Sequence, residues 1–485
     1  MNTQLRWIHR PFAELIRLAW PIAVSMLSIS LMSVVDTLFV SGIGASALAG
    51  VGLAGAAMFT FLCFSVGLLR GVKVVVSQAM GAGRERHAAD YLGAGLAIGG
   101  AFGVVTCLAV ELGAPLLHHL VTTVEAGEHA VTYLRIRVLA APAYLLFVAL
   151  RESCYARGDA RVPMIASVTA NLVNGALDLV FVVFLDLGVA GVAWATAIAG
   201  LVEMAVLFAA RFHEVRALSR VKWSAILAVW RVGLPTGGQF LLQVGAFALL
   251  AALISMMSEV EMAAHQLVFH LLLFCFLPAN AVAEAGSVLA GQAVGADRDD
   301  LVYVVARRAL ALAGGYTALC TAIIWLAAPE IIGAFTDDGA LAVVAVRLMY
   351  IATIFLVADG ANMVVMAILR GAGDVRHAAV VGIASAWVFT PPLTWLLGYQ
   401  AGLGAAGGWI GLCCEIAVCV AILSWRLWRG SWRAAAEESR AQVRGGVGAL
   451  VEDLGEATGQ DPGEVARQDR RDQDVSGSAT DRAAA

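Results

Sequence analysis

The sequence predicts an all-α membrane protein, with twelve transmembrane helices in two six-helix lobes related by pseudo-two-fold symmetry. Hydrophobic residues fill 60% of the 485 positions and charged residues only 14%, whereas soluble domains average ~45–50% and ~25%. The mean hydropathy is +0.82. Apolar runs such as 241–257 show no alternation of polar and apolar residues, which favours helices over the strands of a membrane β-barrel.

Twelve apolar runs, bounded by charged or turn residues, give the expected helices in order. Each run exceeds the ~20 residues that cross a bilayer. The expected spans cover residues 14–39, 47–71, 88–112, 129–151, 162–185, 190–211, 226–253, 263–290, 306–330, 344–369, 377–399 and 405–427. Because no small-residue cleavage site follows the first run, we expect it to remain as the first span.

The chain repeats itself in a fixed register. Pro21 recurs as Pro235, and the segment QAMGAGR at 78–84 recurs as QAVGADR at 292–298, both at a shift of 214 residues. Later motifs recur at a shift of 215. Since six spans per half is an even number, the two halves have the same orientation and are related by an axis along the membrane normal, an architecture found in alternating-access transporters.

The repeat and the apolar runs divide the chain into five parts. We expect an N-terminal flank at 1–13, an N-lobe at 14–211, an inter-lobe linker at 212–225, a C-lobe at 226–427 and a tail at 428–485. The tail is rich in charged residues, Gly and Ala, so we expect it to be disordered apart from a short helix near 432–443. The sequence gives it no role.

Basic residues set the expected orientation. Twenty of the 32 Lys and Arg residues fall in the N-terminal flank and alternate loops, only Arg135, Arg137 and Arg347 fall on the opposite side, and nine follow from Arg426 onward. Because cytoplasmic loops carry the excess of Lys and Arg, both termini are expected on the cytoplasmic side. The expected location is the cell inner or plasma membrane.

Several classes of protein are disfavoured by composition and motifs. A net charge of −4 gives no sign of nucleic-acid binding. The eight cysteines lie in or beside apolar runs without zinc-type spacing, so neither a disulfide nor a structural metal is expected. No protease or hydrolase motif occurs on a span, which argues against an intramembrane enzyme, and no cofactor is expected.

Carboxylates at membrane depth are the candidate functional residues. An Asp at a helix centre costs ~2.5–3.5 kcal/mol on insertion scales, so an intramembrane acid is a functional hypothesis by default. The roles of Glu203, Glu284 and Glu415 stay open, and for the first and last a structural role is as good an interpretation as substrate contact. The acids at this depth are Asp36, Asp178, Glu203, Glu284, Asp359 and Glu415.

The richest setting surrounds Asp178. Asn171, Asn174 and Asp178 share one face of the fifth span because they follow i, i+3, i+7 spacing. Asp36 and Thr196 fall at a similar depth, within ~5–10 Å of the outer boundary at ~1.5 Å per residue. Two carboxylates with amide and hydroxyl oxygens suit a Na⁺ ion, or a pair that carries a proton. The alternative is that the Asn residues pack helices and the acids are solvated.

The second half of the repeat lacks these polar groups. At the matching positions it carries apolar residues or Gly, so the site is not required by the shared fold and is expected in the N-lobe alone. The matching residues are Leu250, Ala386, Phe389, Leu393 and Gly411.

These motifs resemble the multidrug and toxic compound extrusion (MATE) family, and the resemblance covers about residues 14–427. It implies that Asp36, Asn174, Asp178 and Thr196 bind the coupling H⁺ or Na⁺, and that Pro21 acts as a hinge in the first helix. The motifs that carry it are Pro21, Val35-Asp36-Thr37, the paired Gln-Ala-x-Gly-Ala loops, Asn174-x-x-x-Asp178, Gly191-Val192-Ala193-Trp194-Ala195-Thr196, Ala263-Ala264-His265-Gln266 and Leu369-Arg370-Gly371-Ala372-Gly373-Asp374.

The NorM-like branch of that family also has an acid matched by Asp359, but its seventh-helix Glu falls on Gln243 here. A second acidic or substrate site at Asn171, Gln243 and Asp359 is therefore a weaker expectation.

The resulting functional prediction is a monomeric, H⁺- or Na⁺-coupled antiporter that exports amphiphilic, often cationic organic molecules by alternating access. The alternative is a flippase for lipid-linked oligosaccharides or other lipids in the same superfamily, which would need cationic residues in its cavity. A major facilitator transporter is disfavoured, because its acidic-basic loop motif is absent after the second span.

Overall fold

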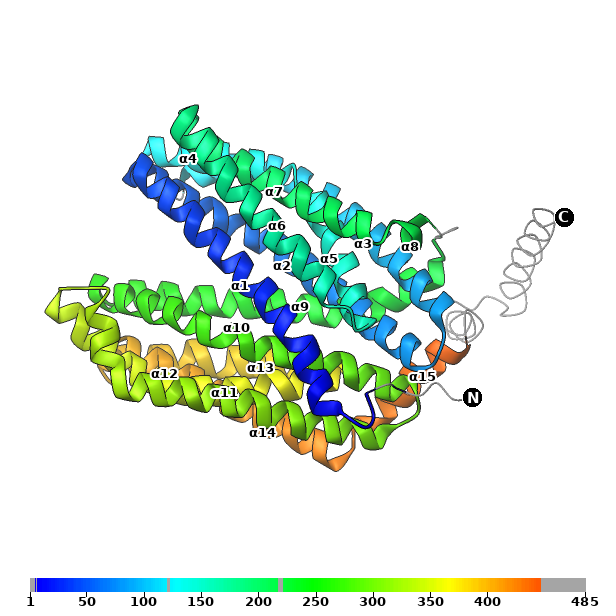
Figure 1. Ribbon diagram of the computed structural model, residues 1–485. Coiled ribbons are helices and arrows are strands. Elements are labelled where there is room, and N and C mark those ends of the chain that lie inside the picture. Colours follow the sequence, from blue (N-terminus) through cyan, green and yellow to red (C-terminus); the bar gives the residue numbers. More distant parts are fainter. Residues whose placement is uncertain (1–4, 6, 120–122, 217–220, 446–485) are drawn as a thin grey trace, which may run out of the picture.

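The computed structural model confirms the predicted fold class, with two lobes of helices that diverge from a common base (Figure 1). It describes residues 5, 7–119, 123–216 and 221–445. The N-lobe contains α1 (Pro11–Ile43), α2 (Ala45–Gly81), α3 (Glu85–Gly113), η1 (Ala114–His119), α4 (Val124–Val138), α5 (Ala141–Ala156), α6 (Arg161–Asp178), η2 (Leu179–Phe184), α7 (Gly188–Ala210) and the short α8 (Phe212–Arg216). The C-lobe contains α9 (Trp223–Ser255), α10 (Glu259–Gly295), α11 (Asp299–Gly333), α12 (Gly339–Gly371), α13 (Val375–Leu393), η3 (Thr394–Gln400) and α14 (Ala405–Arg429), followed by α15 (Arg433–Gly445).

All twelve expected spans have a helical counterpart. Within the described residues, eleven helices are long and apolar enough to cross a bilayer, and the number reaches twelve when α4 and α5 count as one span. These two helices meet at an angle of 51° where a single straight helix was predicted. The break falls just before Pro142, whose ring fits the first turn of a helix but not its interior.

Several helices extend well beyond the predicted ends. The span predicted to end at residue 71 continues to Gly81, because the charge of Lys73, which suggested a loop, is buried in the helix and paired. The sixth and thirteenth helices each continue into a π-helical turn, η2 after Asp178 and η3 after Leu393. Since the turn also follows Leu393 in the second half, it is a feature of the shared fold and does not depend on the carboxyl group of Asp178.

The first helix of each half packs against both lobes. In α1, Leu15, Leu18 and Ile22 pack into the same core as C-lobe residues of α10, whereas Ser25 bonds to Ser167 of α6. In α9 the early turns join the core of the N-lobe, and the last turns join that of the C-lobe. Each crossing helix therefore links the two lobes mechanically.

Pro21 and Pro235 lie within these crossing helices, ten and twelve residues after their first residues. Neither proline lies in the first turn of its helix. Each instead lies near the point where its helix passes from one lobe to the other.

The lobes meet at one end of the molecule, here called the closed end, where the repeated Gln-Ala-x-Gly-Ala segments cross. A Cβ atom on Gly81 would lie 2.0 Å from the carbonyl oxygen of Gln292, and one on Gly295 would lie 2.0 Å from that of Gln78. The two contacts are equivalent, so the pseudo-two-fold axis that relates the lobes passes between them. Any side chain at either glycine would push the lobes apart.

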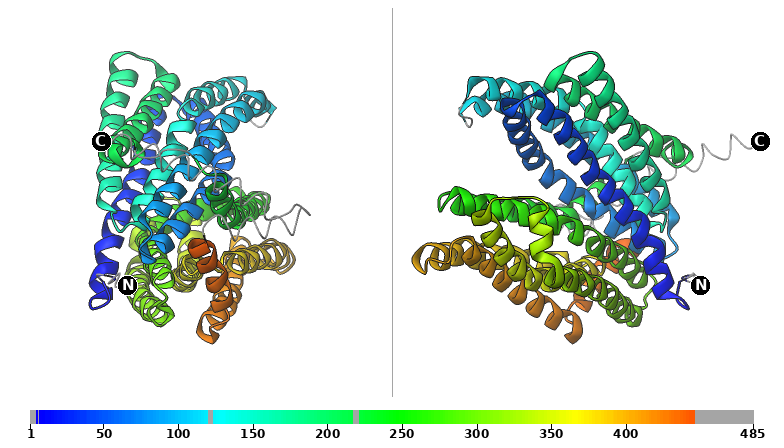
Figure 2. Two further views of the ribbon diagram at one scale, coloured as in Figure 1. Left: turned by 90° about the vertical axis from the view of Figure 1, so that its right-hand side faces the viewer. Right: turned by 60° about the vertical axis from the view of Figure 1, so that its left-hand side comes forward.

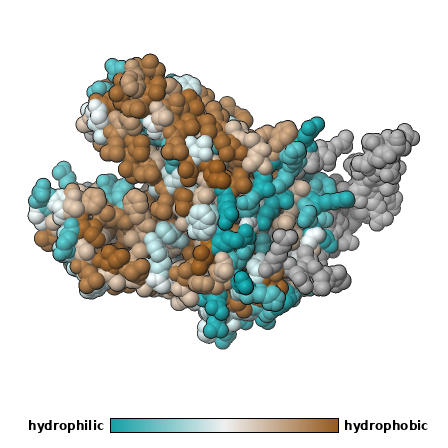
Figure 3. Space-filling view, viewed as in Figure 1, coloured by the Kyte–Doolittle hydropathy of each residue, from teal (hydrophilic) through white to brown (hydrophobic). Residues whose placement is uncertain are grey.

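At the opposite, open end the lobes separate, as the views in Figure 2 also show. The space-filling view shows a notch between the two lobes at this end (Figure 3). Hydrophobic residues cover most of both lobes in that view, and hydrophilic residues gather at the closed end. This distribution fits a body embedded in lipid with its charged end in water.

Candidate functional site

The structure brings the four predicted ion-site residues together inside the N-lobe. Asp36 on α1, Asn174 and Asp178 on α6 and Thr196 on α7 are all buried. The hydroxyl of Thr196 donates to Oδ2 of Asp36 at 3.0 Å, and the carboxyl of Asp178 faces that of Asp36. Three helices that are distant in the sequence thus place two carboxyl groups side by side.

The site holds more acceptor oxygens than the protein satisfies. Oδ1 of Asp36 and both carboxyl oxygens of Asp178 have no hydrogen-bond partner within the described part of the chain. Buried carboxylates without partners are costly, and two of them side by side repel each other. A proton shared between them, or a Na⁺ held with the Thr196 hydroxyl and the Asn174 amide oxygen, would relieve both costs. The residues therefore fit either coupling ion.

Two further residues at this site were not predicted. Tyr133 and Arg137, on successive turns of α4, lie close enough to Asp36 to interact with it electrostatically, and Tyr133 also reaches Thr196. The guanidinium of Arg137 lies 5.8 Å from the ring centre of Tyr133. Their i, i+4 spacing was visible in the sequence, but nothing there indicated that α4 packs beside the acids.

Asn171 lies outside this group of four. Its amide nitrogen donates to the backbone oxygen and hydroxyl of Ser28 on α1, and its Oδ1 has no partner in the described chain. One turn further from the ion site, Ser167 donates to Glu203 at 2.6 Å and pairs with Ser25 at 2.9 Å. A row of polar side chains therefore continues from the ion site along the interface between α1 and α6.

The matching place in the C-lobe is apolar and closely packed. A Cβ atom on Gly411 would meet Leu393 at 3.3 Å, and one on Gly408 would meet Leu250 at 2.8 Å. No pair of acids matches Asp36 and Asp178 there. The C-lobe therefore keeps the helix arrangement of the N-lobe but lacks the polar groups that form the candidate ion site.

The C-lobe acids form a separate cluster. Asp359 on α12 is buried beside Asn362 and close to Glu415 of α14, which accepts a hydrogen bond from Thr390. Gln243 is half-buried on α9, and no hydrogen bond joins it to Asp359 in the described residues. Asn171 lies on α6 of the N-lobe, so a site that uses it together with Gln243 and Asp359 would have to span both lobes, and this site stays a prediction.

A buried ionic network at the closed end escaped the sequence analysis. Lys73 of α2 forms a salt bridge with Glu284 of α10 across the lobe junction, and its Nζ lies 3.7 Å from Glu152 of α5. Arg151 donates to Glu152 at 2.9 Å, and Arg70 lies 3.6 Å from Glu284. Glu284, whose role the sequence left open, thus joins the two lobes. The signals in the sequence were Arg70 and Lys73 inside the apolar run 65–79 and Glu284 at membrane depth.

Replacing Lys73 with Ala is expected to weaken the closed end. Losing one partner of a buried ion pair costs about 3–5 kcal/mol, because the remaining charge is left uncompensated. The thermal unfolding midpoint of the detergent-solubilised protein should fall clearly. Lys222→Ala is the matched control, since that lysine is exposed and forms a surface salt bridge with Asp90 at 3.0 Å. If the two variants had equal midpoints, the salt bridge from Lys73 to Glu284 would contribute no more to stability than the surface pair.

Comparison with known proteins places this arrangement in a family. The MatE family model matches residues 21–180 and 235–396, more than half of the chain, and its two segments begin at the equivalent prolines of the repeat. The chain belongs to the MatE family. Members of this family are transporters, so the chain is a multi-pass membrane transporter of the multidrug-efflux type and not an enzyme.

Curated relatives of this MatE protein include bacterial multidrug resistance proteins. It is 31% identical over 417 residues to the probable multidrug resistance protein NorM of Pseudomonas syringae pv. tomato, covering 82% of this chain and 90% of that protein. It is also 31% identical over 455 residues to the NorM protein of Pseudomonas aeruginosa, covering 88% and 92%. These relatives indicate the cell inner membrane as its location.

Solved structures of MATE transporters have the same fold. One is the outward-facing conformation of a multidrug resistance MATE family transporter of the MOP superfamily, with a TM-score of 0.81, 22% identity and coverage of 88% of this chain and 97% of that one. Another is the eukaryotic MATE transporter AtDTX14, with a TM-score of 0.82, 18% identity and coverage of 90% and 99%.

Proposed function

We propose that this MatE transporter is a monomeric antiporter that exchanges an inward-moving H⁺ or Na⁺ for an outward-moving amphiphilic, often cationic molecule. The observation that carries the proposal is the pair Asp36 and Asp178 inside the N-lobe, whose carboxyl groups include three oxygens that accept no hydrogen bond from the described residues. Such a pair binds a cation strongly only if that cation replaces the missing donors. Ion occupancy therefore changes the charge and the packing of α1 at once.

The closed end faces the cytoplasm in this proposal. The start of α1, α15 and the hydrophilic surface of Figure 3 all lie there, and the distribution of Lys and Arg gives the same orientation. The conformation described here is then open to the outside. Transport requires the bridge from Lys73 to Glu284 to break in the opposite state, so that the lobes separate at their cytoplasmic ends.

Aromatic side chains offer a contact for amphiphilic substrates. Phe59 of α2 and Phe240 of α9 pack edge to face with ring centres 5.9 Å apart, joining the lobes on the open side of Arg70. Aromatic faces bind cationic and apolar groups without demanding one shape, which suits varied substrates. The names of the relatives support a drug substrate over the lipid-flippase alternative.

Ethidium accumulation in everted membrane vesicles, where cellular efflux becomes uptake into the lumen, tests the proposal. A pH gradient and a Na⁺ gradient are imposed separately, with ionophores that collapse each one as controls. We expect one of the two gradients to drive efflux well above the rate of vesicles lacking the protein. Efflux that continues unchanged when both gradients are collapsed would overturn the proposal of ion coupling.

A further inference from the structure

The helix α15 that follows the last span crosses from one lobe to the other at the closed end. Trp432, directly before the helix, and the buried residues Ala436, Ser439 and Val443 follow i, i+4, i+7, i+11 spacing, which places them on one side of α15. Trp432 and Ala436 pack into the core shared with the C-lobe, whereas Val443 packs into the core of the N-lobe. One short helix, ~20 Å long, is thus seated in both lobes.

Polar contacts repeat this division. On the N-lobe side, the hydroxyl of Ser439 donates to Gln78 at 2.5 Å, and Arg84 donates to the backbone oxygen of Val443 at 2.6 Å. On the C-lobe side, Arg440 forms salt bridges with Asp297 and with Asp299, the latter at 2.7 Å.

The contacted residues are those that close this end. Gln78 belongs to the first Gln-Ala-x-Gly-Ala segment and supplies the carbonyl that packs against Gly295. Arg84 ends the first of the repeated segments, and Asp297 lies within the second. Helix α15 therefore contacts both of the repeated segments, 78–84 and 292–298, that meet at the closed end.

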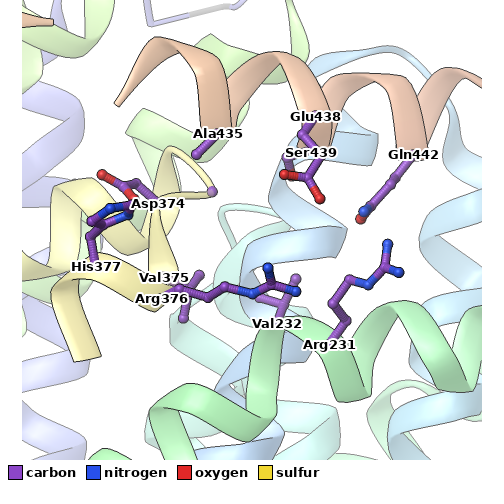
Figure 4. A pocket seen from close by; sticks show the side chains of 11 residues that line it. Arg231, Val232, Asp374, Val375, Arg376, His377, Ala435, Glu438, Ser439 and Gln442 are labelled. Atoms are coloured by element: carbon purple, nitrogen blue, oxygen red, sulfur yellow. The ribbon is translucent and has the colours of Figure 1, made fainter. Parts of the chain in front are cut away.

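The contact between α15 and the rest of the protein includes a hollow. Beneath the middle of α15 lies a pocket where Arg231 of α9 and Arg376 of α13 extend toward Glu438 and Gln442 (Figure 4). A helix that rests on a narrow apolar stripe beside a hollow buries less apolar surface than a fully packed helix. It therefore costs less free energy to detach.

We propose that α15 is a clasp that holds the two lobes together at the closed end and must release the N-lobe in every transport cycle. Because α15 is joined directly to α14, it stays with the C-lobe when the lobes separate, and only its contacts with Gln78, Arg84 and the N-lobe core have to break. The inference deepens the proposed function and rests on it, since only a transporter that opens at this end needs such a release.

Reversible cross-linking tests the clasp. In a cysteine-free background, Gln78→Cys with Ser439→Cys joins α15 to the N-lobe, and Asp299→Cys with Arg440→Cys joins it to its own lobe. Both pairs are bridged by one short bifunctional methanethiosulfonate reagent, which a reductant removes. We expect the first cross-link to reduce ethidium efflux to background and the reductant to restore it, while the second leaves efflux within twofold of the unlinked protein.

Unimpaired efflux with the first cross-link in place would overturn the clasp. Loss of efflux with both cross-links would also overturn it, because fixing α15 to its own lobe should be harmless. Failure of the proposed function looks different: the unlinked protein would then show no gradient-driven efflux at all.

A single substitution tests the contact of α15 with the N-lobe without cross-linking. Val443→Asp places a charge against the N-lobe core while Trp432 and Ala436 stay buried in the C-lobe. Spin labels at Arg86→Cys and Asp300→Cys report the distance between the lobes at this end. We expect the population with separated lobes to rise severalfold, and an unchanged distance distribution would contradict the clasp.

Discussion

Replacing Asp36 with Asn is expected to abolish ion-driven efflux while leaving expression and folding intact. The amide keeps the shape of the carboxyl and its contact with Thr196, but it removes the negative charge that binds the coupling ion. Uptake of ethidium into everted vesicles under the driving gradient, which corresponds to efflux from the cell, should fall to the rate of vesicles without the protein. Gradient-driven efflux at the wild-type rate in this variant would remove Asp36 from the ion site.

The asymmetry of the two lobes supplies the control for this result. Asp178→Asn should cause a similar loss, since it leaves a single acid in the site. Leu393→Ala, at the equivalent position of the C-lobe, removes apolar packing next to Gly411 and should alter stability or substrate range while efflux still depends on the ion. Equal loss of ion dependence in these two variants would refute an ion site confined to the N-lobe.

Replacing Pro21 with Ala is expected to slow transport severalfold more than it weakens drug binding at equilibrium. Proline cannot donate to the carbonyl of Arg17, so α1 lacks a backbone hydrogen bond near the point where it passes between the lobes. Ion binding at Asp36 changes the outer part of the same helix, and a weakened turn lets that part move separately. Alanine restores the hydrogen bond and stiffens the connection.

Drug affinity measured by fluorescence, alongside vesicle efflux, separates switching from binding in this variant. Pro235→Ala is the matched comparison, because that proline occupies the equivalent place in α9, where no acid follows. If Pro21→Ala left turnover unchanged, the proline would have no part in the mechanism. If both variants slowed turnover equally, the effect would belong to the crossing helices in general and not to the ion site.

The fold was predictable because each span is a local pattern. An apolar run marks a helix without reference to any other part of the chain, and the repeat at 214 residues relates the two halves. The helix ends were less accurate, as at α2, because charge was taken to mark a loop. A lysine paired across a lobe junction, like Lys73 with Glu284, has its partner 211 residues away, and no local pattern reveals it.

The candidate ion site was partly predictable for a similar reason. Asn174 and Asp178 share a helix face, and Asp36 and Thr196 could be placed beside them by depth alone. Tyr133 could not, because depth does not tell which helices are neighbours around a lobe. The seating of α15 on both lobes also escaped prediction, since it depends on the crossing of α2 and α10 that only the packed structure contains.

The distances between the lobes at both ends, measured by pulsed electron paramagnetic resonance as the coupling ion is varied, test the account most directly. Spin labels at Arg86→Cys and Asp300→Cys report the closed end, and labels at Ile43→Cys and Met256→Cys report the open end. We expect the two distances to change in opposite directions with pH or Na⁺, and Asp36→Asn to abolish the response. Distances that ignore the ion, or that respond to it equally in Asp36→Asn, would contradict the account.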